Sequence, residues 1–97
     1  MVFDLSQVTG IGPYETKTEK NRTLYLKDGK VFLVINPNTL EVRCDAGLSA
    51  NLIENYESVM VSRYFGKGGI EIVPAGQLTD AELADLARLS YNLTISS

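Results

Sequence analysis

The hydrophobic pattern of the chain is clearest at residues 24–35, LYLKDGKVFLVI. Its first part alternates leucines with amphipathic or charged neighbours, which is the period of a strand with one buried face. Asp28-Gly29 follows, and this pair favours the type I′ turn of a tight β-hairpin because both central residues need a positive φ. Residues 31–35 are apolar at every position, which predicts a central strand covered on both faces.

A third strand and a helix are expected after this hairpin. Alternation over residues 40–45 predicts a strand with one dry and one wet face, with Glu41 on the wet face. Cys44 falls on the dry face, so we interpret it as a structural core thiol. Asp45 can cap a helix at about residues 46–56, whose apolar residues form one stripe.

A further pair of strands is expected at residues 59–65 and 69–73. The glycine-rich segment 66–69 between them predicts a flexible hairpin turn. It does not predict a phosphate-binding loop, because that motif has a different spacing and leads into a helix. The Gly10-Ile11-Gly12 segment likewise fails as a dinucleotide-binding fingerprint, since no third glycine and no helix follow.

The C-terminal helix has the clearest start signal. Thr79-Asp80-Ala81-Glu82 is a capping box, in which the threonine hydroxyl and the glutamate carboxylate each bond the other residue's backbone N–H. Leucines continue the apolar side of this helix as far as residue 93. Residues 1–21, in contrast, predict only irregular structure or a short strand at residues 2–5, with a polar, exposed segment at 16–21.

These elements predict a single α+β domain over residues 1–97: an antiparallel meander of about five strands, one inserted helix and a C-terminal helix. A length of 97 residues with 44% hydrophobic and 22% charged residues suits one globular core. A single cysteine and the absence of histidine exclude an internal disulfide and a histidine-based metal or catalytic site. No long apolar run and no signal peptide are visible, so we expect a cytoplasmic protein without a membrane partner.

Charge is unevenly distributed along the chain, although the net charge is −3. Segment 17–43 carries six cations against three acids, so it is the candidate nucleic-acid surface; solvated faces of both signs are the alternative. The six cations are Lys17, Lys20, Arg22, Lys27, Lys30 and Arg43. A second candidate, a surface pocket or contact that mixes aromatic and cationic groups, comprises Tyr25, Arg63, Tyr64, Lys67 and Tyr91.

The order of the elements and several local motifs resemble the MmcQ/YjbR family over residues 22–95. The motifs are Gly29–Phe32 before an apolar strand, Leu40–Asp45 before a helix, Leu78–Leu83, and Leu89–Leu93 with its Ser-Tyr pair. The resemblance implies a double-wing fold and a DNA-binding label, and the TfoX N-terminal domain has a similar layout. The chain departs from the family in lacking the N-terminal amphipathic helix and the His-Trp pair expected near residues 68–69.

The sequence therefore predicts a non-enzymatic binding domain of the MmcQ/YjbR type without a cofactor. DNA is the candidate partner. The alternative is a protein-interaction or small-ligand module with no nucleic-acid role, acting as a monomer or a homodimer. No catalytic or metal-binding set of residues is predicted, because the carboxylate pairs on the helices are spaced like solvated neighbours and no serine lies in a nucleophile elbow.

Overall fold

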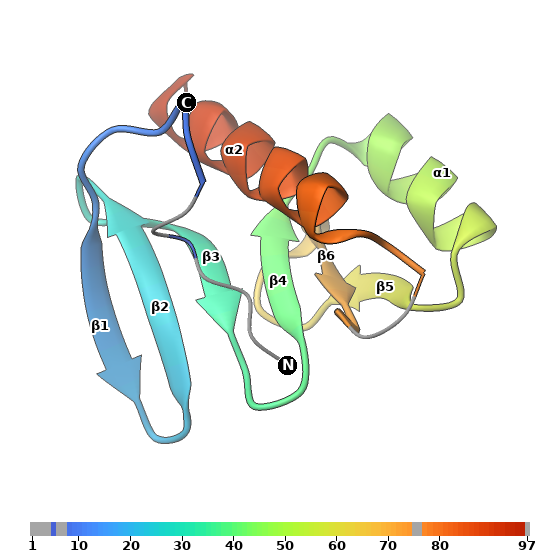
Figure 1. Ribbon diagram of the computed structural model, residues 1–97, viewed down its shortest axis with the longest axis horizontal. Coiled ribbons are helices and arrows are strands. Elements are labelled where there is room, and N and C mark those ends of the chain that lie inside the picture. The colour runs from blue at the N-terminus through green and yellow to red at the C-terminus, as the bar shows by residue number, and fades with distance from the viewer. Residues whose placement is uncertain (1–4, 6–7, 75–76, 97) are drawn as a thin grey trace.

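The computed structural model describes Leu5, residues 8–74 and residues 77–96. The described chain is an α+β domain, as the sequence predicts, with a six-stranded antiparallel sheet and two helices (Figure 1). The elements are β1 Glu15–Glu19, β2 Arg22–Lys27, β3 Lys30–Ile35, β4 Leu40–Arg43, α1 Ala46–Asn55, β5 Val59–Ser62, β6 Gly66–Ile72 and α2 Asp80–Ser96.

The sheet has the order β1-β2-β3-β4-β6-β5. The first four strands follow one another as a meander, and the hairpin predicted at Asp28-Gly29 joins β2 to β3 with φ of 53° and 81° at its two central residues. The chain then passes through α1, so that β5 forms the far edge and β6 returns beside β4. The predicted meander thus holds for β2–β4, which β1 extends at one edge, and the inserted helix reverses the positions of β5 and β6.

Both helices lie on one face of the sheet, which we call the helix face. Helix α2 packs across β3 and β4, and α1 packs on β5 and β6 (Figure 1). The core between the layers includes Leu33, Val42 and Ile70, all fully buried and in register across three neighbouring strands. The opposite face, which we call the open face, carries the intervening residues and is not covered by a helix.

A β-bulge in β3 fits this strand to α2. The register with β2 shifts between Tyr25 and Leu26, so that Phe32 and Leu33 both belong to the core cluster of the helix face. The hydroxyl of the fully buried Ser90 donates to the Phe32 carbonyl and accepts from the Arg43 backbone N–H at 2.8 Å. One serine of α2 therefore joins the helix to the backbones of β3 and β4.

The capping box of α2 forms as predicted. The Glu82 carboxylate accepts from the Thr79 N–H at 2.9 Å, and the Thr79 hydroxyl accepts from the Glu82 N–H at 3.2 Å. Asp45 caps α1 by accepting from the Leu48 N–H at 2.9 Å. Among the described residues, no helix combines the length and the hydropathy that crossing a membrane requires.

The segment before β1 packs on α2. Residues Val8, Ile11 and Tyr14 lie against the core, and the Arg88 guanidinium donates to the Thr9 carbonyl at 2.6 Å. A Cβ on Gly12 would lie 2.8 Å from the Tyr91 hydroxyl oxygen. Gly10 and Gly12, which break regular structure in this segment, thus permit the backbone to lie close to the α2 side chains. The short strand expected at residues 2–5 lies largely outside the described residues.

Two boundary predictions were wrong. Residues 15–19 form the sheet-edge strand β1, whose exposed side chains leave no hydrophobic period to detect. The turn between β5 and β6 falls at residues 63–65, and the glycine-rich segment predicted as the turn is the start of β6. Gly69 is needed in this strand because the Phe65 side chain and the Val42 carbonyl leave no room for a Cβ.

We predict that Gly69→Ala lowers the free energy of unfolding by about 2 kcal/mol, because the added methyl overpacks a tight contact. Its Cβ would lie 2.5 Å from the Val42 carbonyl oxygen and 2.7 Å from the Phe65 Cβ. Gly68→Ala is the matched control, since its nearest contact is an ordinary 3.6 Å. Chemical denaturation of both variants measures the difference, and equal stabilities would contradict the packing described for Phe65.

Candidate functional site

Two buried carboxylates face each other on the open face. Glu41 of β4 and Glu71 of β6 are directly opposed in the antiparallel register, and each residue is only 2% exposed. Like charges at directly opposed positions destabilise a sheet, and a buried carboxylate must be hydrogen-bonded to be tolerated. The residues that donate hydrogen bonds to these two carboxylates define the candidate site.

Glu41 is bonded from two turns. Its Oε1 accepts from the Ser62 hydroxyl at 2.7 Å and from the Tyr64 backbone N–H at 2.9 Å. Its Oε2 accepts from the Asn36 amide nitrogen at 2.9 Å. The carboxylate therefore holds the turn at 63–65 down on the sheet, although the alternation of β4 had predicted a solvent-exposed position.

Glu71 is neutralised by a bidentate arginine. Arg63 donates from Nε to Oε1 at 3.0 Å and from a terminal nitrogen to Oε2 at 2.7 Å. The Thr39 hydroxyl also donates to Oε2 at 2.7 Å. The bonds from Arg63 are the main reason that the pKa of Glu71 lies below its ordinary value, against the opposing effect of burial. The pKa of Arg63 is raised by the same contact.

The turn fixed in this way carries two aromatic rings on the open face. Tyr64 and Phe65 meet edge to face, with ring centroids 5.0 Å apart. The Arg22 guanidinium lies 5.3 Å from the Tyr64 centroid, and that of Arg43 lies 5.1 Å from the Phe65 centroid. Phe65 also covers the small apolar cluster of Leu24, Val31 and Val34. Each ring therefore has a cation against it.

A hollow of about 960 Å³ opens beside this turn. Three turns surround it: the β1–β2 turn, the β3–β4 turn and the turn at 63–65. This volume is in the range of ligand sites, and the lining is polar and of mixed charge. The lining residues are Glu19, Lys20, Asn21, Arg22, Asn36, Pro37, Glu41, Arg63 and Tyr64.

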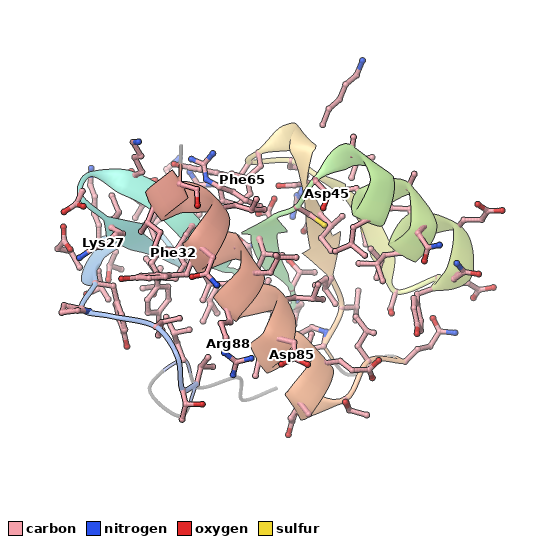
Figure 2. All side chains as sticks on the ribbon, turned by 90° about the horizontal axis from the view of Figure 1, so that it is seen from above. Lys27, Phe32, Asp45, Phe65, Asp85 and Arg88 are labelled. Carbon is pink, nitrogen blue, oxygen red and sulfur yellow. The ribbon has the colours of Figure 1, made fainter. Side chains whose placement is uncertain are left out.

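The structure brings only some of the six predicted cations together. Lys20 and Arg22 line the hollow, and Arg22 is paired with Glu19 at 3.0 Å. Lys17 lies 3.7 Å from the same carboxylate. Lys27 and Lys30 flank the hairpin turn at the opposite end of β2, as Figure 2 shows for Lys27, which lies at one end of the molecule.

Arg43 is the sixth predicted cation. It lies on the open face, where its Nε donates to the Val31 carbonyl at 2.7 Å. The six cations therefore divide between the hollow, the Phe65 ring and the far hairpin turn, with Lys17 on β1 beside Glu19. Arg63, from the second predicted set, joins the group at the hollow.

The three tyrosines predicted to share one pocket lie on different faces. Tyr91 is buried in the helix-face core, with its ring 5.1 Å from that of Phe32, and Tyr25 packs 5.7 Å from Tyr14. Tyr64 lies on the open face. In Figure 2, Phe65, the neighbour of Tyr64 in the sequence, lies apart from the α2 residue Arg88. Lys67 is exposed on β6 and does not line the hollow.

Sequence reasoning missed Glu41, Glu71 and Asn36. Strand alternation assigns the two glutamates to a wet face, and nothing local shows that a turn more than 20 residues from Glu41 folds over them. One signal was present: each glutamate lies within an otherwise largely apolar strand segment. Cys44, by contrast, is buried as predicted, and burial is the main cause of its raised pKa.

The hollow has no metal-binding character within the described ranges, where no group of three or more Cys, Asp or Glu side chains could hold an ion. Comparisons of the chain with family models, with curated proteins and with solved structures found no match. The function is therefore argued from the geometry of the open face.

We predict that Arg63→Gln destabilises the protein at neutral pH and that the loss shrinks on acidification. The folded-state pKa of Glu71 is below its ordinary 4.5, so the pair stabilises the fold above that pH and this contribution is lost as pH falls through the lowered value. Without Arg63, burial has the larger effect on Glu71 and favours its protonated form. Lowering the pH therefore removes no stabilising ion pair from the variant, whereas it does from the parent chain.

The loss of stability is measured by comparing the denaturation midpoints of Arg63→Gln and the parent chain from pH 7 to pH 3. Arg88→Gln is the control for pH dependence: it removes a pair with the exposed Asp85 and a hydrogen bond to the Thr9 carbonyl, and the carbonyl does not titrate. If the difference in stability between Arg63→Gln and the parent chain stayed constant over the whole pH range, Glu71 would not be held ionised by this arginine.

Proposed function

We propose that the chain is a non-enzymatic binding domain whose open face binds DNA. The observation that carries this proposal is the position of Tyr64, which is 39% exposed and lines the same hollow as three cations. Aromatic rings beside cations provide stacking surfaces and phosphate contacts for nucleic acid. The DNA-binding label implied by the MmcQ/YjbR resemblance points the same way.

The exposure of cations at the hollow supports this reading in an acidic chain. Lys20, Arg22 and Arg63 line the hollow together with Glu19 and Glu41, and Arg63 is paired with the buried Glu71. Glu19 is engaged by Arg22, and Glu41 is buried beneath its hydrogen bonds. The side chain of Arg63 is 78% exposed although it pairs with Glu71, and Lys20 projects from an exposed turn. Arg63 and Lys20 are therefore the cations best placed to meet phosphates.

A non-enzymatic role is supported by how the two buried carboxylates are used. All four of their oxygens accept hydrogen bonds from protein donors. General-base catalysis needs a carboxylate within reach of a substrate proton. Here both groups fasten a turn instead.

A small-ligand module is the second candidate, and the position of the hollow between three turns favours it. Its three surrounding turns and its mixed lining, including the Asn36 amide, suit a compact polar ligand. An uncharged ligand of this kind would bind without the steep salt dependence that phosphate contacts give, which separates the two candidates experimentally.

We predict that Lys20→Ala weakens DNA binding and reduces the slope of log K against log salt by about 1, because one phosphate contact is lost. Lys27→Ala is the matched control: this lysine is on the same strand pair, at the hairpin turn away from the hollow. Fluorescence anisotropy with labelled oligonucleotides from 50 to 200 mM salt measures both. Absence of salt-sensitive binding at 50 mM, or equal effects of the two substitutions, would contradict the proposal.

A further inference from the structure

We infer that the hollow binds one unpaired nucleotide, so that the domain prefers single-stranded DNA to duplex. This inference rests on the proposed DNA-binding function and specifies the form of DNA that the same site takes. It depends on three features: the position of the exposed Tyr64 ring, the distribution of charge within the hollow, and the scarcity of cationic residues on the two helices.

The exposed ring lies on the wall of a concavity. Tyr64 is 39% exposed, its ring contacts Arg22 and Phe65, and the residue lines the hollow. In a duplex the base faces are covered by their neighbours, so a protein ring can stack only on a base that has left the stack. Arg22 is itself a flat group that can extend such a stack.

The floor and the rim of the hollow differ in charge. Glu41 is buried at the floor and holds Asn36 of the β3–β4 turn by a 2.9 Å hydrogen bond, while Lys20 and Arg63 come from the other two turns, where Glu19 is paired with Arg22. The buried Glu41 carboxylate repels phosphate, and an amide oxygen can accept a hydrogen bond from a base amino group. Both amide hydrogens of Asn36 are already donated, to Thr39 and to Glu41, so its carbonyl oxygen is the remaining acceptor. A nucleotide therefore enters base first, with its phosphate at the rim.

The helices do not offer a surface for reading a duplex. Duplex-specific domains commonly place a cationic helix in the major groove. Helix α1 contains no lysine or arginine, and α2 contains one arginine against three acids, of which two lie in its first turn. Both helices are packed on the sheet by their apolar sides (Figure 1). The cations and the exposed ring are instead on the open face.

The test compares single-stranded and duplex oligonucleotides of one sequence, together with the mononucleotide, by anisotropy competition at fixed low salt. We expect the single strand to bind at least tenfold more tightly than the duplex. We expect Tyr64→Leu to weaken single-strand binding by roughly five- to hundredfold, the range for loss of one base stack. Tyr64→Phe, which keeps the ring, should bind as the parent does.

Each other outcome has a definite meaning. Equal or tighter duplex binding would overturn this inference and leave the DNA-binding function standing, whereas no binding of either form would remove both. A mononucleotide that binds as tightly as the strand would overturn the assignment of a DNA strand as the ligand and would support the small-ligand module, with a nucleotide as its ligand. If Tyr64→Leu does not fold, the NMR shifts of the Tyr64 ring protons are followed while the parent chain is titrated with the single strand. Stacking of a base on the ring moves these signals upfield, and unmoved signals would refute the stacking.

Discussion

The open face depends on two carboxylates that oppose each other across β4 and β6. Buried as they are, Glu41 and Glu71 would destabilise the sheet if they were left without donors. Their donors come from segments distant in sequence: Asn36 and Thr39 in one turn, and the Ser62–Phe65 region in another. Satisfying two charges therefore fixes the relative positions of two turns, which makes this pair the anchor of the whole face.

Fixing the turn at 63–65 has two consequences for binding. It places the Tyr64 ring and the Arg63 guanidinium at the hollow without a covering helix, and it leaves Arg63 largely exposed although it is paired. Preorganised groups lose less conformational entropy when a ligand binds. The two buried glutamates are therefore compatible with the proposed phosphate contacts, since they position the cation and the ring and their own charge is engaged beneath the surface.

The sequence predicted the parts of the fold that local chemistry determines. The Asp28-Gly29 hairpin, the buried run of β3 and the Thr79 capping box all form as predicted, because each depends on residues within a few positions of one another. Strand β1 was missed because its exposed side chains carry no hydrophobic period. The turn at 63–65 was placed too late because aromatic residues resemble strand and glycines resemble turn.

The candidate site was predicted only in fragments. Lys20, Arg22, Arg63 and Tyr64 were each singled out, but in two separate sets, and the sequence does not show that β1–β2 and β5–β6 turns meet. Their convergence depends on the strand order, in which α1 sends β5 to the edge and β6 returns beside β4. Glu41 and Glu71 could not be recognised as buried for the same reason, since the turn that covers them is brought there by the tertiary fold.

Hydrogen exchange at the Tyr64 backbone amide, measured by NMR, tests this account most directly. An amide in an exposed three-residue turn exchanges almost freely, whereas this one donates to a buried carboxylate at 2.9 Å. The account predicts exchange slowed by orders of magnitude relative to the amides of the exposed Asp28-Gly29 turn, and loss of that protection in Glu41→Ala. Exchange of the Tyr64 amide at its intrinsic rate in the parent chain would contradict it.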